Sequence, residues 1–88
     1  MYLEIVTPEK VVLKGEVESF SVPGINGEFQ VLNNHAPVVS VLTGGFVKVT
    51  TNMQFETSVE KDADNRYRFA ISGGVLEINN NKAIVLAD

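Results

Sequence analysis

Apolar side chains recur at every second position along much of this chain, and this period is the strongest constraint on its fold. In residues 66–71, Tyr67, Phe69 and Ile71 alternate with arginine and alanine, and residues 53–59 show the same pattern. Because successive side chains of a β-strand point to opposite faces, the alternation is typical of strands with one buried and one wet face. The sequence therefore predicts strands, not helices, over both segments.

Turn-forming residues interrupt these strands every few positions. Pairs such as Asn26-Gly27 and Gly73-Gly74 favour tight reversals of the chain. No window of ten or more residues has a helical period without a glycine or a crowd of β-branched residues. Many short strands with close turns predict an all-β fold, an antiparallel two-sheet β-sandwich, formed as a single domain over residues 1–88.

Other segments depart from simple alternation. Three of them are apolar at consecutive or nearly consecutive positions and are predicted to be strands covered on both faces: residues 11–13, 46–49 and 84–86. Residues 16–22 break the alternation, because Val17 falls on one face whereas Phe20 and Val22 fall on the other. We predict a β-bulge within 16–22 that brings these three side chains onto one side.

Charge and composition exclude several classes of function. The net charge is −4, with seven basic residues scattered among eleven acids, so neither nucleic acid nor anionic lipid is a favoured partner. The chain has no cysteine, no apolar run of membrane-spanning length and no signal-peptide pattern at its N-terminus. These features predict a protein of a cytoplasm-like compartment.

The sequence predicts no metal and no cofactor. One histidine without cysteine cannot make a zinc site of the usual ligand spacing. Residues 62–65 begin like a calcium loop but lack the glycine at its sixth position and the closing glutamate. We interpret 62–65 as an exposed turn between the strands predicted at 53–59 and 66–71, because Asp and Asn form turns readily.

Two chemical alternatives stay open. One is a small hydrolase that uses His35, the only histidine, although no serine lies in a Gly-X-Ser-X-Gly elbow and a Glu28–His35 pair requires the fold to bring the two together. The other is a carrier domain with a modified Lys82, which follows three asparagines. We favour an ordinary solvated position for Lys82 and a position held by backbone hydrogen bonds for His35, because such positions are far commoner than catalytic or modified ones.

The order of several short segments carries a resemblance. LEIVTPE begins at residue 3, KGEVESFSVPGINGEFQVL at residue 14, HAP at residue 35, LTGGFVKV at residue 42, SGGVLEI at residue 72 and KAIVLAD at residue 82. In this order and register they resemble the N-terminal domain of the epsilon subunit of F-type ATP synthase, which is called delta in mitochondria. The resemblance covers nearly the whole chain.

The resemblance implies a β-sandwich in the central stalk that turns with the rotor and performs no bond chemistry. Its partners would be the gamma subunit and the polar loops of the membrane-embedded c-ring. The turn formed by Ile25, Asn26, Gly27 and Glu28 would face the c-ring. His35 is a further candidate contact, although a histidine held by backbone hydrogen bonds at a strand start is the favoured interpretation.

The resemblance also bears on the C-terminus and on location. The family commonly continues into two helices that in many bacteria restrain ATP hydrolysis, whereas this sequence ends at Asp88. We therefore expect neither inhibition through a helical arm nor ATP bound on one. The implied location is peripheral, through the partners, at the cytoplasmic face of a bacterial inner membrane, with the stromal face of a chloroplast thylakoid as the less favoured alternative.

Overall fold

A computed structural model describes residues 1–52, 60–61 and 64–88 of the chain. The described residues are all-β and include no helix long and apolar enough to cross a membrane. They form ten strands: β1 (Tyr2–Val6), β2 (Val11–Glu16), β3 (Ser19–Gly24), β4 (Gly27–Leu32), β5 (Val38–Leu42), β6 (Gly45–Thr50), β7 (Glu60–Lys61), β8 (Tyr67–Ile71), β9 (Gly74–Asn79) and β10 (Lys82–Ala87).

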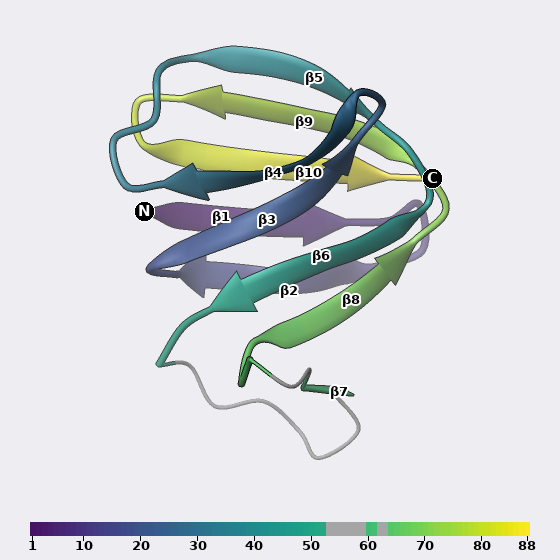
Figure 1. The fold of residues 1–88 in the computed structure, drawn as a ribbon, viewed down its shortest axis with the longest axis horizontal. Coiled ribbons are helices and arrows are strands. Elements are labelled where there is room, and N and C mark those ends of the chain that lie inside the picture. The colour runs from purple at the N-terminus through teal and green to yellow at the C-terminus, as the bar shows by residue number, and fades with distance from the viewer. Residues whose placement is uncertain (53–59, 62–63) are drawn as a thin grey trace.

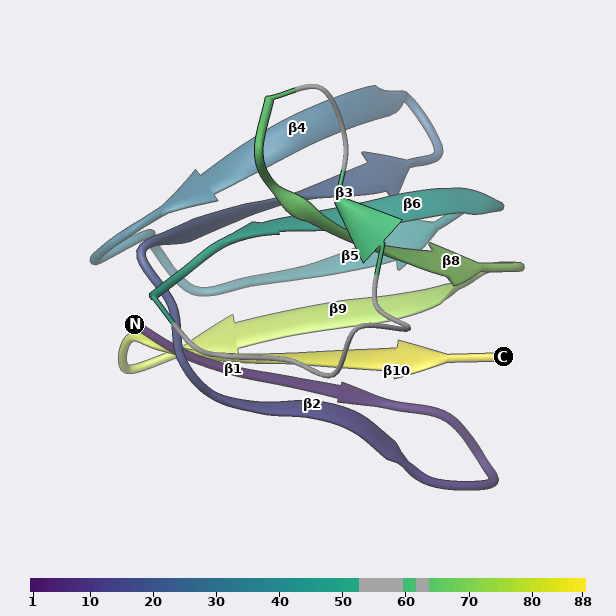
Figure 2. The ribbon, with the colours of Figure 1, turned by 90° about the horizontal axis from the view of Figure 1, so that it is seen from below.

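The strands form two facing layers, which confirms the predicted all-β sandwich (Figures 1 and 2). One layer runs β2-β1-β10-β9-β5, and the other contains β3, β4, β6, β8 and β7. Two details differ from the prediction. The layers belong to one curled sheet, because β5 touches β3 through the pair Gly24 and Leu42. In addition, β1 and β10 pair in parallel, because they are far apart in the sequence and no short turn forces them to run oppositely.

The core lies between the layers. The largest of the side chains with at most 2 % exposure come from both: Leu3, Ile5, Leu76, Ile78 and Val85 from one layer, and Phe20, Val22, Val31, Val47 and Val49 from the other. Inward-facing aliphatic and aromatic residues on alternate positions can interdigitate in this way at the density of a crystal. The alternation seen in the sequence therefore identifies the faces that meet in the core.

The parity break at residues 16–22 is resolved by a corner, not by the predicted bulge. β2 ends at Glu16 and β3 begins at Ser19, so Val17 and Glu18 form a two-residue connection. The chain passes from one layer to the other through this connection. The backbone amide of Glu18 donates to the carbonyl oxygen of Thr50 (2.9 Å), which attaches the connection to the end of β6. Val17, Phe20 and Val22 all reach the core, as expected, with exposures of 5 %, 1 % and 0 %.

The turn between β9 and β10 fixes one end of the sandwich. Asn80 and Asn81 both have positive φ, 53° and 59°, as a type I′ hairpin turn requires. The Asn81 side chain reaches the β4–β5 connection: its Oδ1 accepts from the Asn34 amide (2.8 Å) and its Nδ2 donates to Asn33 Oδ1 (2.9 Å). Three asparagines in a row predict a turn, but not that one of them joins two loops.

The hairpin predicted at 62–65 is described only in part. β7 pairs antiparallel with β8, with Lys61 opposite Tyr67, and Asp64 and Asn65 are exposed. Asn65 has a φ of 64°, which fits a turn residue. The strand predicted at 53–59 and residues 62–63 lie outside the described residues, so the interpretation of 62–65 as a hairpin turn that binds no calcium stays a prediction.

Candidate protein-binding site

Residues Ile25–Glu28 lie where the chain reverses from β3 to β4 at one end of the sandwich (Figure 1). Ile25 and Asn26 connect the two strands and Gly27 and Glu28 begin β4, and we call the four together the Ile25–Glu28 turn. All four residues are exposed, and Ile25 presents 63 % of its surface to solvent. The turn is nevertheless attached to the sheet, because the Ile25 amide donates to the Val41 carbonyl (3.3 Å) and the Thr43 amide donates to Pro23 (2.8 Å). It is therefore an exposed feature on a fixed support.

Two glycines allow the reversal. Gly27 has a φ of 119°, a backbone conformation that side-chain-bearing residues rarely adopt. Gly24 is required for a different reason: a Cβ there would lie 2.9 Å from the Gly27 carbonyl oxygen and 3.0 Å from Phe29. The sequence pattern Gly-Ile-Asn-Gly thus specifies a tight hairpin in which the two strands approach closely.

A shallow cleft of about 320 Å³ adjoins this turn, lined by the turn itself with Phe29 and Ser40. Among the described residues that line it, the Glu28 carboxylate is the only ionisable side chain. A single carboxylate beside polar backbone groups can accept hydrogen bonds or pair with a cation of another protein. The described lining places no second acid or base beside Glu28 for proton-transfer chemistry, so this arrangement fits binding.

His35 lies at the other end of β4 from this turn, in the connection to β5 (Figure 1). Its Nδ1 is 2.7 Å from the carbonyl oxygen of Ala36, and its backbone amide donates to Leu32 (3.2 Å). The structure thus places Glu28 and His35 at opposite ends of a six-residue strand. The acid–base pair is not formed, and the backbone-held histidine is what the structure shows.

An apolar row crosses the outer face of the layer that contains β1. We define it by five residues that are directly opposite one another on adjacent strands: Val41, Val75, Leu86, Val6 and Val11. Val41, Leu86 and Val11 are 55 %, 49 % and 54 % exposed. The row runs along the same end of the sandwich as the Ile25–Glu28 turn, since Val41 accepts the Ile25 hydrogen bond.

The apolar row corrects one prediction. Residues 11–13, 46–49 and 84–86 are strands, as expected, but they are not covered on both faces. Val11 and Leu86 are about half exposed, and Phe46 is 39 % exposed with Arg68 stacked 4.7 Å from its ring centre. Their second apolar face therefore lies open among the described residues, which form no further layer against it.

Polar residues border the row on the same face. The next rank of opposed residues is mixed, with Val39, Glu77, Ile84, Glu4 and Lys14 in succession across the strands. Beyond it, Lys82 lies opposite Tyr2 and its ammonium is 5.4 Å from the ring centre. The row thus lies near the strand ends with mixed polar and apolar residues on one side, and polar residues beside apolar ones are usual at the rim of a protein-binding surface.

This placement of Lys82 weakens the carrier alternative. Lys82 is the first residue of β10, paired with Asn79, and the tip of the hairpin is formed by Asn80 and Asn81 instead. Its ammonium stacks on Tyr2 instead of extending from the tip. A carrier lysine has to be presented freely to other enzymes, and this one packs on its own sheet.

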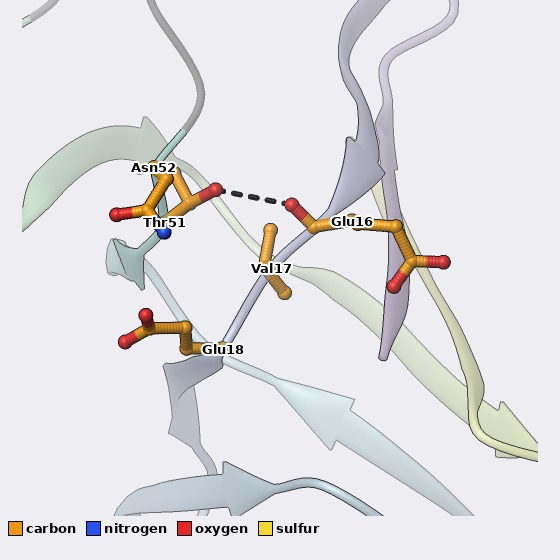
Figure 3. Close-up of a pocket in the computed structure, with 5 residues that line it drawn as sticks. All are labelled: Glu16, Val17, Glu18, Thr51 and Asn52. Atoms are coloured by element: carbon orange, nitrogen blue, oxygen red, sulfur yellow. Dashed lines mark hydrogen bonds between the residues drawn. The ribbon is translucent and has the colours of Figure 1, made fainter.

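The largest cleft that we describe, about 420 Å³, lies at the corner between β2 and β3 (Figure 3). Thr51 Oγ1 donates to the Glu16 carbonyl oxygen (3.0 Å), which ties the end of β6 to this corner. The carboxylates of Glu16 and Glu18 point to opposite sides in Figure 3. Because these two do not converge, the described lining residues offer no paired-carboxylate geometry for acid–base catalysis or cation binding.

Fold and surface together define a small all-β sandwich module with an exposed apolar row and an exposed hairpin turn. The chain belongs to the family described as ATP synthase, Delta/Epsilon chain, beta-sandwich domain, whose model matches residues 1–88. The resemblance found in the sequence motifs is thereby confirmed.

Individual relatives agree with this assignment. The chain is 40 % identical to the ATP synthase epsilon chain of Chlorobaculum tepidum, over 98 % of this chain and 86 % of that protein. It is 38 % identical to the epsilon chain of Rhodopseudomonas palustris, of which it spans 56 %. Its fold matches a chain in the central stalk/c-ring structure of Tetrahymena thermophila mitochondrial ATP synthase with a TM-score of 0.81 at 16 % identity, over 99 % of this chain and 62 % of that one.

Proposed function

We propose that this chain is a non-catalytic rotor subunit of an F-type ATP synthase, in the central stalk that links the gamma subunit to the c-ring during ion-gradient-driven ATP synthesis. The observation that carries the proposal is the exposed apolar row across five strands. Contiguous apolar surface on a small domain marks a surface that a partner covers. Family membership supports a partner in the ATP synthase central stalk, and the stalk assemblies that contain its structural neighbours agree with that choice.

The apolar row is the surface that we assign to the gamma subunit. A torque-bearing contact has to exclude water and stay bound through each rotation, and aliphatic side chains on a rigid sheet suit both needs. The five members of the row come from five adjacent strands, so the surface cannot deform without breaking the sheet. The polar ranks beside it would then form the rim of the interface.

The Ile25–Glu28 turn is the surface that we assign to the c-ring loops. This assignment is supported by the exposure of all four residues and by the two hydrogen bonds that hold the turn. The Glu28 carboxylate in the adjoining cleft supports it further. Through these partners the chain would be held peripherally at the cytoplasmic face of a bacterial inner membrane. His35, at the opposite end, is not assigned to this contact.

A pair of matched leucine substitutions tests the proposal. Leu86→Asp introduces a charge into the apolar row, whereas Leu32→Asp introduces it at a similarly exposed leucine of β4, 57 % against 49 % exposed. We expect Leu86→Asp to weaken binding to the gamma subunit by at least about 2 kcal/mol, the loss typical of an interface hot spot. The measurement is co-purification of the tagged protein with gamma. Leu32→Asp should change it little.

The melting temperature of each isolated variant is the folding control for this experiment. Equal loss of assembly in both folded variants would count against the apolar row as the gamma-facing surface. Assembly of the wild-type protein only with itself, seen as a concentration-dependent dimer, would replace the proposal with a homo-oligomeric one.

A further inference from the structure

The Ile25–Glu28 turn contains the only asparagine of this chain that is followed by glycine, Asn26-Gly27. The seven other asparagines are followed by asparagine, histidine, methionine, arginine or lysine. Asn26 and Gly27 are both exposed at the tip of the β3–β4 hairpin. One asparagine therefore differs from the rest in the residue that follows it and sits in an exposed tight turn.

This difference matters for the side-chain amide. An asparagine side chain has the length that lets its carbonyl carbon be attacked by the backbone nitrogen of the next residue, closing a five-membered ring. A side chain on that next residue hinders the approach, and glycine has none. A Cβ added at Gly27 would meet nothing within 4 Å, so the space around this residue is open. Exposed loop tips are also the places where a chain departs most readily from its average conformation.

We propose that Asn26 is a site of spontaneous deamidation. The Gly27 nitrogen gives up its proton to a base in solvent and forms a bond to Asn26 Cγ. The side-chain nitrogen takes a proton from solvent, its bond to Cγ breaks, and it leaves as ammonia. Water then opens the resulting succinimide at either carbonyl and leaves aspartate or isoaspartate at position 26. The reaction needs only water and a base.

The product changes the turn in two ways. It adds one negative charge next to Glu28, in a chain whose formal net charge is already −4. Isoaspartate also lengthens the backbone by one carbon between Gly24 and Gly27, which face each other across the hairpin. That change disturbs the direction of Glu28 and the hydrogen bond from Ile25 to Val41. If the turn contacts the c-ring as proposed above, deamidation weakens this contact as the protein ages.

The chemical test follows each asparagine of the intact purified protein. Samples are held at neutral and mildly alkaline pH, digested, and analysed by mass spectrometry for the exchange of an amide NH2 for OH. We expect this exchange at Asn26, faster at the higher pH, while Asn33 and Asn80 stay amides. Asn26→Gln is the control, because its longer side chain would have to close a six-membered ring. Retention of the amide at Asn26 for as long as at the other positions would overturn the proposal.

A second arm separates this proposal from the proposed function. Aged wild-type protein and aged Asn26→Gln protein are rebound to membranes stripped of their stalk subunits. We expect the aged wild type to bind less in proportion to its isoaspartate content, and the variant to be unaffected by ageing. If the mass change appears and binding does not fall, the modification site stands and the c-ring contact has to lie elsewhere on the sandwich.

Discussion

The backbone amide of Ile25 donates a hydrogen bond to the carbonyl oxygen of Val41, at 3.3 Å. Ile25 opens the turn assigned to the c-ring, and Val41 is an end member of the apolar row assigned to gamma. A second bond, from the Thr43 amide to Pro23 (2.8 Å), reinforces the connection. The two proposed partner surfaces therefore share one hydrogen-bonded backbone frame, which is a mechanical arrangement suited to a rotor that turns as one body.

Glu28→Gln should leave folding nearly unchanged and weaken membrane rebinding. Glu28 is exposed, so the free energy of unfolding should change by less than about 0.5 kcal/mol. Association with the membrane sector should weaken by about 0.2–1 kcal/mol if the carboxylate is at the rim of the contact, and by more if it is desolvated against a partner charge. The measurement is rebinding of the stalk assembly to stripped membranes at low and high salt.

Glu18→Gln is the control for that experiment. It removes the same charge from another exposed glutamate, in the β2–β3 connection. In the rim case, high salt should shrink the difference between wild type and Glu28→Gln, because exposed charges are screened within about 8–10 Å. Unfolding of Glu28→Gln, with unchanged rebinding per folded molecule, would instead identify a structural acid and move the docking role elsewhere.

Gly24→Ala should destabilise the domain. The added Cβ would lie 2.9 Å from the Gly27 carbonyl oxygen, which is backbone and cannot swing aside. Overpacking of this kind costs about 1–3 kcal/mol. Gly44→Ala is the matched control: its Cβ would come no closer than 3.4 Å to any atom, so lower entropy of the unfolded chain should leave it neutral or more stable by about 0.4–1 kcal/mol. Urea unfolding of both variants measures the contrast, and equal stability of the two would show that the hairpin relaxes freely.

Asn81→Gly should cost more stability than Asn80→Gly. Both residues have positive φ in the same turn, so glycine relieves the backbone and loosens the unfolded chain equally at the two positions. Only Asn81 has its side chain bonded to Asn33 and to the Asn34 amide. An exposed hydrogen bond contributes about 0.5 kcal/mol to stability, the low end of the usual range, so two of them predict a difference of about 1 kcal/mol in the free energy of unfolding. Thermal or urea unfolding measures this difference. Equal stability of the two variants would mean that water replaces the two hydrogen bonds of the Asn81 side chain without loss of folding free energy.

Tyr2→Phe should remove part of the alkaline sensitivity of the fold. Desolvation raises the pKa of the Tyr2 phenol above its usual 10, and the hydrogen bond it donates to Glu4 (3.0 Å) raises it further. The neutral phenol is thus favoured in the folded state, so its contribution is fully present below the unfolded pKa near 10 and is lost as the pH rises through the folded value. Urea midpoints measured from neutral to strongly alkaline pH should fall more steeply for wild type than for the variant. Parallel curves would contradict this.

Much of the fold could be predicted from local pattern. Alternation over 66–71 specified β8, and the apolar runs at 46–49 and 84–86 lie in β6 and β10. The Asn-Gly pair specified the exposed hairpin in which the four residues predicted to face the c-ring lie together, whereas His35, the fifth candidate, lies in the β4–β5 connection. These successes share a cause: side-chain direction in a strand and positive φ in a turn are decided by a few consecutive residues.

Other features depend on contacts between distant segments. The sequence alone determined that this protein is made of short strands with tight turns, that its net charge disfavours nucleic acid, and that its motifs belong to one family. Only the tertiary structure decided that β1 runs parallel to β10, that Asn81 joins two loops, and that Val6, Val75 and Leu86 line up in one row. Strand register sets which residues face each other, and a run apolar on both faces does not say which face is left open. The binding surface is therefore a product of pairing between strands up to 80 residues apart, Tyr2 with Lys82 for example, which no local pattern encodes.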